Sequence, residues 1–235
     1  MSNGFTVLPL GLWSEKPLSH FITSFFISPL NDHIITGSFE GTIIIWSLES
    51  DKITPKWSVF SLSSSCKNIV YGGCIRSEHY AVCLSNSNEL CVLRINDGTC
   101  HEFKVDLKYQ HKQIKSYKSY ILDYNCIMCH GSYNQIIIMH GISLNYLFYL
   151  DTNELNSYIL GFVVFSLASS SQDVILGITS TSKVNLWTLN GKETKGLSVK
   201  PNESKSIAQI SSILCLDHTV ANPRVVLIVT KLEWM

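Results

Sequence analysis

A run of β-forming residues recurs in this chain at a nearly constant interval. Four runs align so that one large residue of each falls in a single column: Trp46, Leu93, Met139 and Trp187. The intervals between these positions are 47, 46 and 48 residues. A repeat of this length indicates one supersecondary unit copied along the chain, because such units bury their apolar faces by stacking on their neighbours.

Each column run lies third in a set of four short runs. In the first unit these are Phe21 to Ile27, His33 to Ser38, Thr42 to Leu48 and Lys56 to Leu62. Branched and aromatic residues fill the runs, and Ser, Asn, Gly and Asp separate them, which is typical of β-strands joined by turns. The fourth run is the most polar, as expected for a strand with one uncovered edge. The pattern predicts an all-β fold, a β-propeller of four-stranded blades.

The repeats divide the chain into one propeller region of about four and a half blades. The predicted repeats span residues 14–62, 63–107, 108–150, 151–199 and, in part, 200–235, with the fourth outer strand at Thr194 to Val199. Residues 1–13 contain an apolar run, Phe5 to Trp13, that fits a ring-closing outer strand. An unclosed ring exposes a blade face and strand edges, so we expect the chain to be a fragment of a larger ring.

Composition excludes several classes of protein. The chain has 235 residues, with 18 Lys and Arg against 18 Asp and Glu, and this balance argues against a general nucleic-acid binder. The longest apolar run has 11 residues, too few for a transmembrane segment. No secretory signal is visible, and most of the eight cysteines lie in apolar runs. We therefore expect a cytoplasmic protein with reduced, buried cysteines.

One motif suggests redox or haem chemistry. Cys126-Ile-Met-Cys129-His130 has the Cys-x-x-Cys-His spacing of c-type haem attachment. In a strand, however, an offset of three residues places the two thiols on opposite faces, so we expect two buried thiols and a loop histidine. A zinc site with His130 and His140 lacks a second closely spaced ligand pair. No nucleophile, phosphate-loop or acid–base motif is present, and we expect no enzyme activity, cofactor or metal. A redox or haem-binding protein remains the alternative hypothesis.

The only concentration of basic residues runs from Lys104 to Lys118. Five lysines are interleaved there with Tyr109 and Tyr117: Lys104, Lys108, Lys112, Lys115 and Lys118. Such a segment could contact an acidic partner or anionic lipid headgroups, which makes a peripheral membrane binder a further alternative. It is also typical of a solvated outer strand whose lysines prevent edge pairing.

Residues 38–46, Ser-Phe-Glu-Gly-Thr-Ile-Ile-Ile-Trp, resemble the turn and strand of WD repeats. Glu40 takes the place of the usual Asp beside the turn glycine Gly41, and Ser19-His20 stands where that family has Gly-His. The Asp of the Trp-Asp pair is replaced in all four repeats, by Ser47, Arg94, His140 and Thr188. The resemblance implies a degenerate WD-repeat propeller that acts as a non-catalytic protein-interaction scaffold.

A narrower resemblance lies in particular segments. VLPLGLWSEKPLSHFITSFF, HIITGSFEGTIIIWSL, NDGTCHEF and CHGSYNQIIIMHGISLNYLFYL are similar to the N-terminal propeller of the rabconnectin-3 beta chain family of large WD-repeat proteins. This resemblance implies a regulator of the assembly and activity of the vacuolar proton pump, and so of vesicle acidification. The implied partners are the rabconnectin-3 alpha chain and pump subunits, on the cytosolic face of endosomal or secretory vesicles.

Overall fold

The computed structural model describes residues 20–49, 52–118, 124–152, 156–167, 172–181, 184–188, 208–216 and 225–232. Within these ranges every regular element is a strand, and every strand pair is antiparallel. The strands form separate sheets in which sequence neighbours pair, which is the arrangement of propeller blades.

The first three sheets have four strands each. Blade 1 contains β1 (Ile22–Ile27), β2 (His33–Ser38), β3 (Thr42–Glu49) and β4 (Lys52–Ser61). Blade 2 contains β5 (Cys66–Ile75), β6 (Glu78–Ser85), β7 (Glu89–Arg94) and β8 (Cys100–Val105). Blade 3 contains β9 (His111–Lys118), β10 (Asn125–Gly131), β11 (Gln135–His140) and β12 (Tyr146–Asp151).

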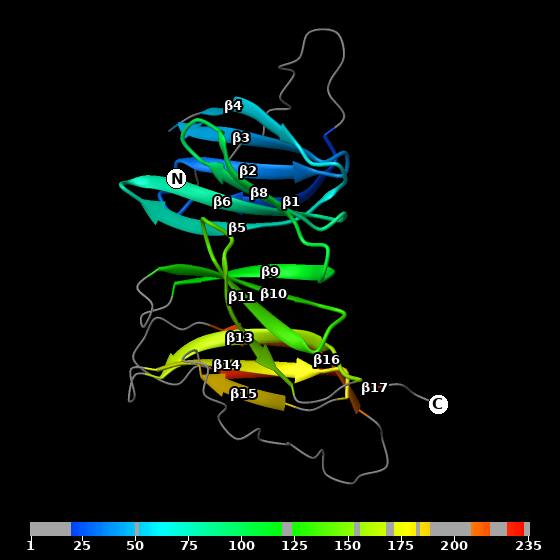
Figure 1. The fold of residues 1–235 in the computed structure, drawn as a ribbon. Helices are drawn as coiled ribbons and strands as arrows, with labels where there is room; N and C mark the ends of the chain where they lie inside the picture. Colours follow the sequence, from blue (N-terminus) through cyan, green and yellow to red (C-terminus); the bar gives the residue numbers. More distant parts are fainter. Residues whose placement is uncertain are drawn as a thin grey trace, which may run out of the picture.

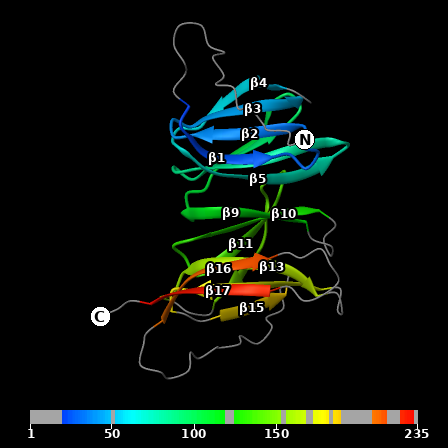
Figure 2. The same ribbon diagram turned by 180° about the vertical axis from the view of Figure 1, so that it is seen from behind.

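Two smaller sheets follow. Blade 4 contains β13 (Ile159–Leu167), β14 (Gln172–Thr179) and β15 (Val184–Thr188), and blade 5 contains β16 (Ala208–Leu216) and β17 (Val225–Leu232). The blades succeed one another from β1–β4 at the top of Figure 1 to β13–β15 near the bottom. The view from behind shows β16 beside β13, and contacts between these strands agree with it (Figure 2).

Apolar side chains fill the spaces between successive blades. Alternation along β6 sends Ala81 and Cys83 towards blade 1, and Val82 and Leu84 towards blade 3. The clusters between blades 1 and 2, blades 2 and 3, and blades 3 and 4 therefore share strands and form a continuous stack. The predicted fold class is confirmed: the chain is all-β and forms a partial β-propeller.

The outer strands differ from one another in polarity. On β8 most side chains are exposed, as predicted for a polar outer strand. The outer strand β12 is largely apolar, and Tyr146 and Tyr149 nevertheless reach solvent. In blade 1, three apolar side chains are exposed: that of Phe21, just before β1, and those of Ile22 and Phe25 on β1.

Two expectations about local structure were wrong. His130 lies inside strand β10 and is buried, because β10 continues past the predicted Cys129 limit to Gly131. Cys74 and Cys100 are exposed, whereas the other cysteines with described side chains are buried, as predicted: Cys66, Cys83, Cys91, Cys126 and Cys129. The predicted strands Phe5 to Trp13 and Thr194 to Val199, and the side chain of Cys215, lie outside the described residues.

Candidate interaction surface

The segment that joins blade 2 to blade 3 is held by two polar side chains. Asn88, which has a φ of 68°, donates its side-chain N–H to the carbonyl oxygens of Asp106 and Tyr109. Its side-chain oxygen accepts the backbone N–H of His111 at 2.9 Å. Asp106 Oδ1 accepts the backbone N–H groups of Lys108 and Tyr109 at 3.0 and 3.1 Å. This part of the basic segment is therefore a fixed turn.

A buried polar network lies beneath that turn. Asp106 Oδ2 accepts from His111 Nε2 at 3.0 Å and from the Tyr146 hydroxyl. The opposite nitrogen of the imidazole, Nδ1, lies 2.7 Å from the Tyr133 hydroxyl. Burial lowers the pKa of His111 although Asp106 is adjacent. Burial tends to raise the pKa of Asp106, but hydrogen bonds from Tyr146, Tyr109 and Lys108 outweigh it and leave that pKa below its ordinary value. The network ties the segment before β9 to strand β12.

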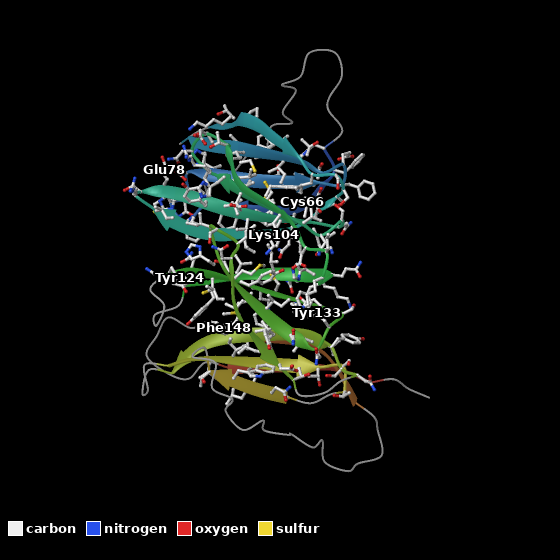
Figure 3. The ribbon with its side chains drawn as sticks, viewed as in Figure 1. Cys66, Glu78, Lys104, Tyr124, Tyr133 and Phe148 are labelled. Carbon is white, nitrogen blue, oxygen red and sulfur yellow. The ribbon has the colours of Figure 1, made fainter. Side chains whose placement is uncertain are left out.

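Four of the five lysines lie over aromatic rings. The Nζ of Lys104, which is labelled in Figure 3, is 3.6 Å from the centroid of the Tyr146 ring and so joins blade 2 to blade 3. Lys108 lies 4.7 Å from the Tyr109 centroid. Such cation–π contacts hold the ammonium groups close to the rings.

The remaining lysines of the segment lie elsewhere. The Nζ atoms of Lys112 and Lys115 are each 4.9 Å from a ring centroid of blade 4, that of Tyr158 and of Phe162 respectively. Lys115 also donates to the Phe162 carbonyl oxygen at 2.6 Å. Lys118 ends β9, roughly 23 Å along the strand from His111 at ordinary strand rise. The structure thus brings Lys104 and Lys108 to one junction and Lys112 and Lys115 to the next, and leaves Lys118 apart.

A groove of about 340 Å³ opens beside Lys108 on the outer side of blade 3. The register of β11 and β12 shifts between Ile138 and Met139, where Met139 pairs with Tyr146 and Ile137 with Tyr149. This bulge places Tyr146 and Tyr149 on one face although they are three residues apart. Tyr146 is 47% exposed and Tyr149 62%. The groove is lined by Lys108, Tyr109, Ile137, Tyr146, Leu147, Phe148 and Tyr149.

The groove was not predicted from the sequence. The repeat pattern places Tyr146 and Tyr149 on the fourth run of the third unit, and strict alternation would place them on opposite faces. The one local signal is the high aromatic content of residues 146–149, Tyr-Leu-Phe-Tyr. Exposed aromatic residues are enriched in surfaces that bind other proteins.

The residues of the repeat column occupy structural positions. In blade 1, Trp46 Nε1 donates to Thr36 Oγ1 at 2.8 Å, and the same oxygen lies 2.9 Å from His20 Nε2. Leu93 and Met139 are fully buried between blades. Trp187 is 3% exposed, and its Nε1 donates to the Asp151 carbonyl oxygen at 2.9 Å.

The turn between β2 and β3 contains Glu40 and Gly41. Gly41 has a φ of +87°, and a Cβ there would lie 2.5 Å from the Leu62 carbonyl oxygen. Glu40 is exposed and electrostatically coupled to His20. The turn therefore brings the start of blade 1 and the segment after β4 together.

The Cys-x-x-Cys-His segment is divided between two interfaces. Cys126 belongs to the cluster between blades 3 and 4, and Cys129 to that between blades 2 and 3. The predicted opposite orientation of these thiols is confirmed. His130 Nδ1 lies 3.2 Å from the Ile159 carbonyl oxygen and Nε2 lies 3.2 Å from Gln113 Oε1. Burial lowers the pKa of His130 to about 4.

The described residues contain neither a metal-binding cluster nor a membrane-spanning helix. None of their His, Cys, Asp and Glu side chains forms a group of three or more that could hold a metal ion. In the same part of the chain, no helix has the length and apolar character that a membrane span requires.

Comparisons with known proteins agree with the architecture. No family model matches the sequence. WD repeat-containing protein 72 of Mus musculus is 24% identical over 184 residues, which cover 77% of this chain and 16% of that protein. The Homo sapiens protein is also 24% identical, with 17% of its length covered. The chain thus spans about a sixth of the length of these curated relatives.

A solved structure shares the fold. The crystal structure of the computationally designed Ika4 protein superimposes with a TM-score of 0.51, at 12% identity, over 74% of this chain and 94% of that one. Together with the blade architecture, the weak similarity to WD repeat-containing protein 72 supports a WD-repeat protein.

Proposed function

We propose that the chain is a non-catalytic interaction scaffold that binds a partner protein at the groove on the outer side of blade 3. The carrying observation is the pair of exposed rings, Tyr146 and Tyr149, on an outer strand next to the Lys108 ammonium group. Tyrosine supplies large contact area at low entropic cost, and it is among the side chains on which binding energy concentrates. WD-repeat similarity supports the same class of function.

The chemistry of the groove favours a segment that carries an apolar side chain beside a carboxylate. The rings and Ile137 offer apolar contact, and Lys108 offers a cation at the rim. The Asp106 carboxylate beneath the turn is buried and already accepts from His111 and Tyr146. The cation at the rim therefore selects an acidic segment over a basic one, and most strongly at low ionic strength.

In this scaffold the Asp106–His111 pair has no catalytic role. Tyr133 and Tyr146 occupy the polar atoms that a substrate would need, and His111 is fully buried. A general base must be able to reach the proton that it removes, and these contacts prevent that.

We further propose that the partners are those implied by the rabconnectin-3 beta-like segments described above. These are the rabconnectin-3 alpha chain and vacuolar proton pump subunits, met on the cytosolic face of endosomal or secretory vesicles. In that role the chain contributes to regulation of pump assembly and vesicle acidification. The similarity to one family of large WD-repeat proteins, over the segments quoted above, supports this part of the proposal.

Affinity capture with mass spectrometry tests both the binding at the groove and the role with the vacuolar proton pump. The full-length tagged protein is compared with Tyr149→Ala, and with Ile53→Ala as a matched control. Ile53 is 47% exposed on β4, the outer strand of blade 1. We expect Tyr149→Ala to lose a partner that Ile53→Ala retains, and that partner set to include pump subunits. Partners retained equally by both variants would contradict the groove, and the absence of pump subunits would contradict the finer role.

A further inference from the structure

Strands β7 and β8 bring two cysteines into contact at the surface of blade 2. Cys91 on β7 is fully buried, and Cys100, the first residue of β8, is exposed. Their Sγ atoms are 3.5 Å apart. The register shifts between Val92 and Leu93, so that Cys100 pairs with Leu93 and its side chain lies on the blade 1 side with Cys91.

The tight connection between β7 and β8 limits how far the two thiols can separate. The backbone N–H of Arg94 donates to the Thr99 carbonyl oxygen at 2.9 Å, and that of Gly98 donates to the Arg94 carbonyl oxygen at 2.9 Å. Asp97 Oδ1 accepts from the Thr99 N–H at 3.0 Å. A bond between the sulfurs therefore needs local side-chain movement rather than opening of the sheet.

The pair is the outer end of a series of thiols. Cys83 is the cross-strand partner of Cys91, and Cys66 is hydrogen-bonded to Cys83. Burial raises the pKa of Cys91, and the hydrogen bond that Cys83 donates to Cys66, together with burial, raises the pKa of Cys83. Cys100 is the member of the series that a solvent-borne oxidant can reach, and Cys91 is the thiol that can react next.

We propose that Cys91 and Cys100 form a reversible disulfide in response to hydroperoxides. The Cys100 thiol loses its proton to solvent and the thiolate attacks the hydroperoxide. The O–O bond breaks, Cys100 becomes a sulfenic acid, and the leaving alkoxide or hydroxide takes a proton from solvent to give an alcohol or water. The Cys91 sulfur then attacks the Cys100 sulfur and its S–O bond breaks. The oxygen leaves as water with the Cys91 proton, and a thiol reductant restores both thiols.

Cys74 provides the matched control. It is exposed like Cys100, but its Sγ lies 3.9 Å from His79 Nε2 rather than against a thiol. Oxidation of Cys74 therefore gives a sulfenic acid that contacts none of the described thiols, whereas oxidation of Cys100 continues to a disulfide.

The test is peptide mapping of the full chain after treatment with hydrogen peroxide. Trypsin cleaves after Arg94, so residues 77–94, with Cys83 and Cys91, separate from residues 95–104, with Cys100. We expect a linked peptide pair with the mass of both peptides less two hydrogens, absent in Cys100→Ser and Cys91→Ala and retained in Cys74→Ser. Dimedone should label Cys100 in Cys91→Ala.

Three outcomes would overturn the proposal. Peroxide treatment that leaves Cys100 fully open to alkylation contradicts the first step. A linked pair that persists in Cys91→Ala assigns the bond to Cys83 instead. A pair that links only between two copies of the chain, as non-reducing electrophoresis would show, also contradicts the intramolecular reaction.

Discussion

The Lys104 ammonium group lies 3.6 Å from the centroid of the Tyr146 ring and so joins the outer strands of blades 2 and 3. The hydroxyl of the same ring donates to Asp106, in the segment that links these blades. Tyr146 thus contacts a cation through the face of its ring and a carboxylate through its hydroxyl group. Removal of either contact should loosen the junction that forms the groove.

A double-mutant cycle measures the first contact. Lys104→Met keeps the length of the side chain and removes the charge, and Tyr146→Leu removes the ring. We expect a coupling in the free energy of unfolding of about 0.5–1 kcal/mol, typical of a partly exposed cation–π pair. A coupling of zero in urea titrations would show that the two side chains do not interact.

The contacts of Thr36 with Trp46 and His20 should stabilise blade 1. Thr36→Val preserves the side-chain shape but removes the oxygen that accepts from Trp46 and contacts His20. The loss of these half-buried contacts should cost about 0.5–1.5 kcal/mol of unfolding free energy. Thr42→Val on β3 provides a control outside this network. Equal losses for the two variants would contradict a special role for Thr36.

A side chain at position 41 should destabilise the turn between β2 and β3. Gly41→Ala adds a Cβ 2.5 Å from the Leu62 carbonyl oxygen, at a positive φ of 87°. A loss of about 1–3 kcal/mol in unfolding free energy is expected, because both the backbone strain and the collision act. Glu40→Ala, in the same turn and with an exposed side chain, should lose less. Thermal denaturation of the two variants that gave equal shifts would contradict this account.

The lowered pKa of His130 should make the stability of the protein depend on pH. Its folded pKa is about 4 against 6.5 for the free side chain, so the unfolded chain binds more protons between these values. Stability should therefore fall as pH falls from 6.5 to 4, by roughly 3 kcal/mol at about 1.4 kcal/mol per pH unit. His130→Gln, which cannot titrate, should show a shallower slope in urea unfolding over this range. Parallel slopes for both proteins would contradict the assignment.

The repeating strands could be predicted because their signal is local. Leu93, Met139 and Trp187 each lie on the third strand of a blade, in the cluster that this blade shares with the preceding one. Trp46 holds the same position in blade 1, where it donates to Thr36 of the same blade. Alternation along a strand also correctly separated Cys126 from Cys129. Both inferences need only the period of the strand and the period of the blade.

The groove and the thiol pair could not be predicted because both depend on bulges. The shift between Ile138 and Met139 places Tyr146 beside Tyr149 on one face, and the shift between Val92 and Leu93 places Cys100 near Cys91. A bulge exchanges the faces of all residues beyond it, and no residue pattern here marks its position. His130 was misassigned for a related reason: its partner, the Ile159 carbonyl, comes from the next blade.

Site-specific photo-crosslinking tests the central claim most directly. p-Benzoylphenylalanine is placed at Tyr149 in the groove and, as a control, at Ile53 on the outer strand of blade 1. The account predicts that, in cells, the probe at position 149 crosslinks a partner protein through an acidic, apolar segment, and that the probe at position 53 does not. Crosslinking of the same partner at position 53 but not at 149 would contradict binding in the groove.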